Sequence, residues 1–196
     1  MHHDDADRGS SVHWAGDPLP RPVFRPSDTV SRSTHQRFVQ LGFDDVEAGA
    51  WVHFESVAIA LHSAVNRALA HHHQLSLADV QLLAHLKGHG PSAMGALAEL
   101  LMVTPSALTQ QIQRLERRRL VHREASSDDG RRVLATITRD GLRLTVASLE
   151  TYARVVRAHF LDELSRNQMI ALGDGCRRIS ARLKAVGASV DSSDTQ

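Results

Sequence analysis

The chain has 196 residues, 42% of them hydrophobic and 23% charged, which is typical of a folded globular protein with a core of its own. Its single cysteine, Cys176, excludes an internal disulfide framework and is typical of the reducing cytoplasm. No apolar run is long enough to cross a membrane and no secretion signal opens the sequence, so we expect a cytoplasmic protein without a membrane partner. The formal net charge of +1 argues, at first sight, against a nucleic-acid partner.

The net charge conceals an uneven distribution along the chain. Residues 1–103 carry seven basic and eleven acidic side chains, whereas residues 104–143 carry nine basic and five acidic ones. A local excess of arginine is a candidate footprint for DNA phosphates. A solvated, arginine-rich helix surface would give the same count, so charge alone leaves both interpretations open.

The first two segments differ sharply in composition. Residues 1–43 are predicted to form a flexible, proline-rich extension, with Trp14 and Phe24 as its large apolar anchors near the prolines. In residues 44–72, apolar side chains recur at steps of three and four, from Val46 to Ala68. This spacing predicts a long helix with one buried face.

Three shorter helices are predicted next. Ser76 followed by Asp79 resembles a capping box, with Asp in place of the usual Glu, and predicts a helix over residues 76–87. A short helix at residues 93–101 follows. The pair Thr104-Pro105 then predicts a new helix to residue 118, because Thr caps well and Pro is favoured at the first helical position. The side chains of this helix expected to face inward are Leu108, Ile112 and Leu115.

The period then changes from helix to strand. Residues 121–125 and 133–137 alternate apolar and polar side chains around the turn signal Asp128-Asp129-Gly130, which predicts a β-hairpin. Thr138 can cap a long helix over residues 139–163, and Ser165 with Gln168 forms a second capping box. The last helix, residues 166–186, repeats apolar side chains in an a/d seam that would pack against another helix or a second copy of itself. Residues 187–196 are predicted to be a disordered tail.

This order of elements predicts a mainly α fold with a small β-hairpin wing. A winged helix-turn-helix would occupy about residues 76–138. The long helices at residues 44–72 and 139–186 exceed what that module needs for its own core, so we expect them to form the interface of a homodimer.

Over residues 45–186 the chain resembles the MarR family of bacterial transcriptional regulators. The resemblance rests on an ordered set of short motifs between Leu97 and Gly141. Each motif is weak alone, and the set with this spacing is specific. The matching residues are Leu97-Ala98, Thr104-Pro105-Ser106, Leu115-Glu116, Asp129-Gly130-Arg131, Thr138 and Gly141.

The fold and the resemblance together predict the residues that contact DNA. A recognition helix in the major groove needs short donors and acceptors near its N-terminus, where the bases are closest. The residues that supply them are Thr104, Ser106, Thr109, Gln110 and Gln113. For Gln111 and Arg114, a base contact and a solvated or phosphate-contacting face both stay open. In the wing, the resemblance implies that Arg131 enters the minor groove, oriented by Asp129, and that Arg132 contacts phosphate. The alternative is that Arg131 and Arg132 are merely exposed charges on the hairpin.

One position departs from the family pattern. The family has Gly after the recognition helix, where the backbone turns left-handed, and this chain has Arg119. We expect Arg119 either to adopt that conformation, at a cost on the order of 1 kcal/mol, or to change how the helix ends.

The resemblance also implies a repressor released by a small, often aromatic, ligand. One side of the first long helix carries Trp51, Glu55, His62 and Asn66, which could line an effector pocket, and an ordinary helix flank is the alternative. The run of His71, His72 and His73 raises a metal-responsive regulator as a rival, although adjacent histidines point in different directions and no ligand stands beside them at metal-binding spacing. No pattern indicates catalysis or a cofactor. The remaining rival is a protein-interaction module that has lost DNA binding.

Overall fold

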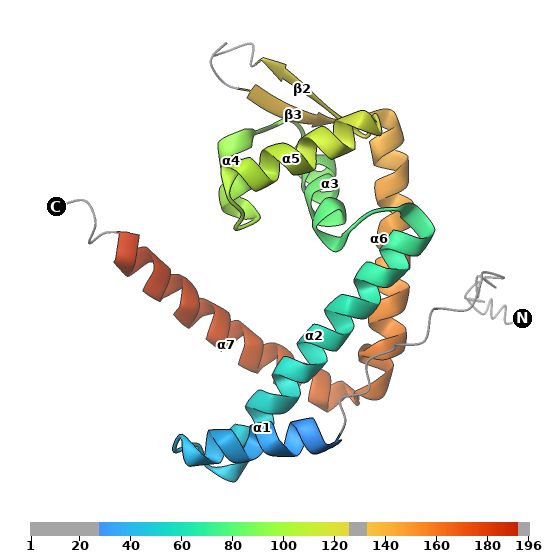
Figure 1. Cartoon of the computed structure of the whole chain (residues 1–196). Coiled ribbons are helices and arrows are strands. Elements are labelled where there is room, and N and C mark those ends of the chain that lie inside the picture. The colour runs from blue at the N-terminus through green and yellow to red at the C-terminus, as the bar shows by residue number, and fades with distance from the viewer. Residues whose placement is uncertain (1–27, 126–132, 192–196) are drawn as a thin grey trace, which may run out of the picture.

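The computed structural model describes residues 28–125 and 133–191 as a mainly helical chain with one small sheet (Figure 1). No helix in this part of the chain is long and apolar enough to span a membrane. The elements in chain order are α1 (Asp28–Gln40), α2 (Asp45–His73), α3 (Leu77–His89), β1 (Ser92–Ala93), α4 (Met94–Leu100), α5 (Pro105–Arg117), β2 (Val121–Ala125), β3 (Val133–Ile137), α6 (Arg139–His159), a 3₁₀ turn (Leu161–Glu163) and α7 (Arg166–Asp191).

The helix starts confirm the predicted caps. The Ser76 side chain accepts a hydrogen bond from the Asp79 amide, and the Asp79 carboxylate accepts one from the Ser76 amide. Thr104 caps α5 ahead of Pro105, and Thr138 caps α6. These side chains satisfy amides that a helix leaves unpaired at its start, so short polar signals fix where the elements begin.

The core lies where α3, α4 and α5 pack against the sheet and against the ends of α2 and α6. The sheet has the order β1-β3-β2, and β2 pairs antiparallel with β3 from Val121 opposite Ile137 to Ala125 opposite Val133. The inward prediction for α5 is confirmed, because Leu108, Ile112 and Leu115 are buried. The winged helix-turn-helix prediction is therefore confirmed, with strand β1 as an addition to the hairpin.

The structure corrects the predicted bounds at three places. Residues 28–40 belong to helix α1 rather than to a flexible extension, and α1 lies against α2, with His35 Nε2 3.2 Å from Asp45 Oδ1. Helix α6 ends at His159, and residues 161–163 form the 3₁₀ turn instead of its last turn. Helix α7 continues to Asp191, past the predicted start of a disordered tail at residue 187. Trp14 and Phe24 lie outside the described residues.

Figure 1 shows how the long helices relate to the core. Helices α2 and α6 run side by side away from the winged helix-turn-helix, and α1 lies across the far end of α2. Helix α7 follows the end of α6 that is remote from the winged helix-turn-helix and extends from there as a separate arm. The winged helix-turn-helix and helix α7 therefore lie on different parts of the molecule.

Candidate nucleic-acid interface

Helix α5 carries an exposed polar face from its N-cap to Gln113. Thr104, Ser106, Gln110 and Gln113 are exposed, while the apolar side chains of the same helix point into the core. Thr104 Oγ1 accepts from the Ala107 amide at 3.2 Å and lies 3.1 Å from Ser106 Oγ. This face of α5 therefore presents hydroxyl and amide groups to solvent, as the sequence predicted.

Thr109 lies partly covered at the edge of this face. Its hydroxyl donates to the Pro105 carbonyl at 2.8 Å, one turn back in α5. That bond uses the hydroxyl proton, so Thr109 is left with lone pairs that can accept a hydrogen bond from a ligand.

Two neighbouring side chains on α5 turn inward to Asp79 on α3. Gln111 is buried, 7% exposed, and its Nε2 donates to Asp79 Oδ1 at 3.2 Å. Both interpretations of Gln111, as a base contact and as a solvated or phosphate-contacting side chain, are therefore wrong. Arg114 donates to the same oxygen at 2.6 Å with its side chain 49% exposed, so part of its guanidinium still faces solvent.

The hairpin next to α5 is tied to it by an ion pair. Arg123, on β2, donates through Nε to Glu116 Oε1 at 3.1 Å, and its NH2 lies 2.9 Å from Oε2. This two-point contact fixes the base of the wing on the C-terminal half of α5. The predicted wing-tip residues Asp129, Arg131 and Arg132 lie outside the described residues.

Helix α5 ends in a left-handed turn at Arg119, whose φ is 58°. The Arg119 amide donates to the Glu116 carbonyl at 2.8 Å, and the Leu120 amide to the Leu115 carbonyl at 3.0 Å. This is the pair of bonds that a C-terminal glycine usually forms. Of the two outcomes expected from the missing glycine, the chain adopts the first, and Leu115 and Leu120 pack in the core behind the turn.

Arg118, directly before that turn, binds the C-terminus of α2. Its NH1 donates to the Gln74 carbonyl at 2.5 Å and its NH2 to the His73 carbonyl at 3.0 Å. No sequence pattern indicated this contact, because its partners lie more than forty residues away in the chain. It joins the end of the candidate recognition helix to the end of a long helix.

The four residues of α2 predicted to bind an effector lie outside the pocket between α1 and α2. Trp51, Glu55 and His62 are exposed, with Trp51 beside Phe54 at 6.1 Å between ring centroids. Asn66 Oδ1 accepts from the Leu77 amide at 2.9 Å, so this side chain joins α2 to the start of α3.

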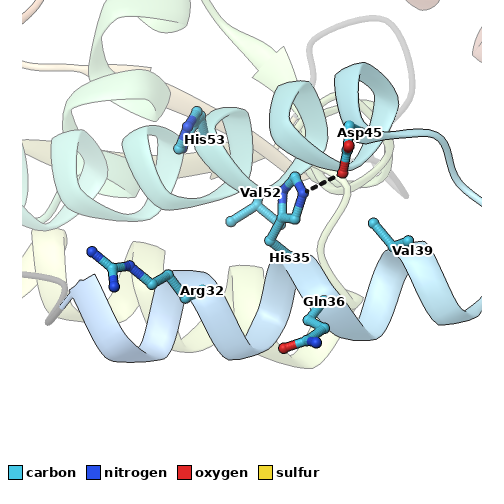
Figure 2. Close-up of a pocket in the computed structure, with 7 residues that line it drawn as sticks. All are labelled: Arg32, His35, Gln36, Val39, Asp45, Val52 and His53. Carbon is cyan, nitrogen blue, oxygen red and sulfur yellow. Dashed lines mark hydrogen bonds and ion pairs between the residues drawn. The ribbon is translucent and has the colours of Figure 1, made fainter.

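A pocket opens instead between α1 and α2 (Figure 2). It contains none of the four predicted residues. His35 lies in its centre and bonds to Asp45, as the dashed line shows. The residues that line the pocket are Arg32, His35, Gln36, Val39, Asp45, Val52 and His53.

The three consecutive histidines lie at the C-terminus of α2. His73 Nε2 is 2.8 Å from Thr151 Oγ1 on α6, so this ring joins α2 to α6. Burial, and then the positive charges of His72 and Arg154, hold the pKa of His73 below its ordinary value. Within the residues that the structure describes, no three histidine, cysteine or acidic side chains are grouped so that they could hold a metal ion.

Comparison with known proteins gives matches over the same region. A model described as MarR family matches residues 73–132. The HTH-type transcriptional repressor MdtR of Bacillus subtilis (strain 168) is 29% identical over 93 residues, which are 47% of this chain and 59% of MdtR, so the match spans less than two thirds of that relative.

Two solved structures from Streptomyces coelicolor are similar over most of their length. AbsC, a MarR family transcriptional regulator, aligns with a TM-score of 0.67 and 28% identity over 73% of this chain and 97% of AbsC. Sco3205, a MarR family transcriptional regulator in complex with DNA, aligns with a TM-score of 0.66 and 24% identity over 70% of this chain and 88% of Sco3205. At 24% identity, the likeness to Sco3205 shows a shared fold alone.

Proposed function

We propose that the chain is a MarR family transcriptional regulator rather than an enzyme, and that it binds double-stranded DNA sequence-specifically as a homodimer; the MarR family match over residues 73–132 and the likeness to AbsC support this proposal. The observation that carries this proposal is the exposed polar face of α5 beside the hairpin. Exposed Gln110 and Gln113 can each read an adenine through two hydrogen bonds in the major groove. The first amides of α5 can also donate to phosphate.

The wing supplies the second DNA contact in this proposal. Arg131 enters the minor groove, where a narrow, strongly negative groove attracts a guanidinium, and Asp129 orients it. Arg132 and the solvent-facing part of Arg114 contact phosphate. The ion pair between Arg123 and Glu116 supports this role, because it holds the hairpin in a fixed place beside α5.

The homodimer is supported by exposed apolar side chains on the long helices. A monomer that kept them in water would expose an apolar surface of the kind that normally binds a partner. On α7, Leu172, Ile179 and Leu183 belong to the a/d seam seen in the sequence, which favours a second copy as the partner. The exposed apolar residues on α2 and α7 are Val46, Trp51, Phe54, Val57, Ile59, Ile170, Leu172, Ile179 and Leu183.

A two-fold dimer implies a near-palindromic operator with half-sites about one helical turn apart. We further propose that the dimer is a repressor released by a small aromatic ligand, which the family resemblance implies. The exposed side of α2 with Trp51, Glu55 and His62 is the candidate contact surface. Addition of salicylate as a probe to the complex of protein and DNA tests this step, and release of the DNA is expected.

The central experiment measures affinity for the DNA upstream of the protein's own gene by fluorescence anisotropy. Gln110→Ala and Gln113→Ala are each expected to weaken binding roughly ten- to hundredfold, because each removes a paired base contact. Gln81→Ala, an exposed glutamine on α3, is the matched control and should bind as the unmodified protein does.

Other outcomes of the same measurement would replace the proposal. If Arg131→Ala and the two glutamine variants all bind with unchanged affinity, the protein is an interaction module that has lost DNA binding. If binding requires zinc and a chelator abolishes it, the protein is a metal-responsive regulator instead.

The dimer is tested separately by sedimentation. Ile179→Glu places a charge in the apolar seam of α7 and is expected to give a monomer, whereas Ala181→Glu, on the opposite side of the same helix, should leave the dimer intact. A monomeric unmodified protein would overturn this part of the proposal.

A further inference from the structure

The C-terminus of α2 is held by a side chain from the end of α5. The Arg118 guanidinium donates two hydrogen bonds, to the Gln74 carbonyl at 2.5 Å and to the His73 carbonyl at 3.0 Å. Gln74 is left-handed, with φ of 53°, and its own amide donates to the Ala70 carbonyl at 3.0 Å. The chain turns there, and both carbonyls face one guanidinium.

The chemistry of this contact is favourable on both sides. The last carbonyls of a helix have no partner within it, and they form the negative end of the helix dipole. A guanidinium is planar, always charged and able to donate two hydrogen bonds at once, so it satisfies both carbonyls in one fixed orientation. A lysine could donate to these carbonyls but would not fix the angle between the two helices.

Arg118 differs in its contacts from the two other arginines near the end of α5. Arg114 binds Asp79 on α3, which is a contact within the winged helix-turn-helix. Arg117 is exposed and donates to the Gln113 carbonyl of its own helix at 3.4 Å. Arg118 alone of the three reaches α2, and this contact occupies a guanidinium that a count of charges assigns to the phosphate footprint.

The same junction is joined to α6. His73, whose carbonyl accepts from Arg118, places its ring 2.8 Å from Thr151 Oγ1 on α6. Thr151 is buried. The end of α5 is therefore anchored to the point where the two long helices are themselves held together.

We propose that Arg118 is a positioning residue that fixes the direction of α5 relative to α2, and thereby the half-site spacing that two copies of the protein can read. This inference rests on the proposed function, because α2 belongs to the proposed dimer surface and α5 is the proposed reading helix. In a two-fold dimer, the distance and angle between the two α5 helices follow from how each is joined to its own α2.

The first test needs no DNA. Nitroxide labels at Ala70→Cys on α2 and Ala107→Cys on α5, in a chain with Cys176→Ser, report the distance between the helices by pulsed electron resonance. Each labelled chain is mixed with excess unlabelled protein, so that only one protomer of a dimer carries labels and the measured distance lies within that protomer. Arg118→Met is expected to broaden the distance distribution, Arg118→Lys to broaden it less, and Arg117→Met to leave it unchanged.

The second test measures affinity for operators with one base pair added or removed between the half-sites. The unmodified protein is expected to lose about tenfold or more in affinity on these operators, and Arg118→Met to lose only about threefold. Arg117→Met removes the same charge and should keep the full spacing penalty. A phosphate contact at Arg118 would instead weaken binding to every operator equally and reduce the dependence on salt.

The two tests separate failure of this inference from failure of the proposed function. An unchanged distance distribution in Arg118→Met overturns the inference, as does an unchanged spacing penalty. If the unmodified protein binds no operator, the proposed function fails, and the distance measurement still decides whether Arg118 fixes α5 on α2. Where Arg118→Met does not fold, Arg118→Lys gives the same comparison against Arg117→Lys.

Discussion

The guanidinium of Arg114 on α5 and the carboxylate of Asp79 on α3 lie 2.6 Å apart, and the carboxylate is almost fully buried. The same carboxylate accepts from Gln111 Nε2 and from the Ser76 amide, so it caps α3 and holds two side chains of α5. One acidic residue therefore sets both the start of α3 and the seating of the proposed recognition helix.

Replacing Asp79 with Ala is expected to lower the free energy of unfolding by about 2–4 kcal/mol, because it removes a helix cap and leaves the buried Gln111 amide and part of Arg114 without an acceptor. Arg114→Ala should cost less, about 1 kcal/mol, since its side chain is half exposed. Urea unfolding measures both. Glu99→Ala, which removes an exposed carboxylate on α4, is the control and should change stability by less than about 0.5 kcal/mol. A loss below 1 kcal/mol for Asp79→Ala would contradict the role assigned to this residue.

Gly141, in the first turn of α6, is the glycine that the packing requires. A Cβ placed there would lie 2.1 Å from the Leu120 carbonyl oxygen and 2.8 Å from Ile137 Cγ1. Because the Leu120 backbone cannot move away from such a Cβ without distorting the chain, Gly141→Ala is expected to destabilise the protein by about 3 kcal/mol. Gly88→Ala on α3 has open space around its Cβ and should instead stabilise by about 0.5–1 kcal/mol. Equal effects of the two substitutions in thermal unfolding would refute this explanation.

Local signals in the sequence were enough to predict most element starts. Caps such as Ser76, Thr104 and Thr138 act within three residues, so their partners are visible in the sequence itself. The departure at Arg119 was visible for the same reason. The inward face of α5 followed from spacing, because a buried stripe repeats every three to four residues.

The misses share a dependence on partners distant in the chain. Helix α1 is polar and short, so its helicity depends on packing against α2, which no local pattern reports. Strand β1 has two residues and exists through its pairing with β3. Gln111 is buried and donates to Asp79, which lies 32 residues earlier in the chain, and Arg118 binds carbonyls 44 and 45 residues earlier. Spacing within α5 could not distinguish these side chains from solvated ones.

The left-handed residue that ends α5 offers a stabilising substitution. Arg119 holds φ of 58° with a side chain that disfavours it, so Arg119→Gly is expected to raise stability by about 0.5–1 kcal/mol. Arg117→Gly, two residues earlier and within α5, should instead lower stability by about 1 kcal/mol. The two melting temperatures are compared with that of the unmodified protein. A loss of stability in Arg119→Gly would show that the Arg119 side chain makes contacts that outweigh the backbone strain.

The junction of α2 with α6 gives the protein a dependence on pH. Burial lowers the pKa of His73 from its ordinary 6.5, and the nearby charges of His72 and Arg154 lower it further. Below pH 6.5 the unfolded chain therefore binds a proton at this residue that the folded chain does not bind. Stability is fully present above pH 6.5 and falls as the pH drops from there through the lower pKa of the folded state. His85, whose pKa is lowered by burial and by His89, contributes in the same direction.

Urea unfolding between about pH 7.5 and about pH 5 measures this effect. The unmodified protein is expected to lose stability on acidification, and His73→Gln to lose less across the same range, because glutamine can still bond to Thr151 without titrating. His62→Gln, at an exposed position on α2, should keep the full dependence on pH. If His73→Gln and His62→Gln show the same dependence as the unmodified protein, the loss at acidic pH comes from other groups and not from the α2–α6 junction.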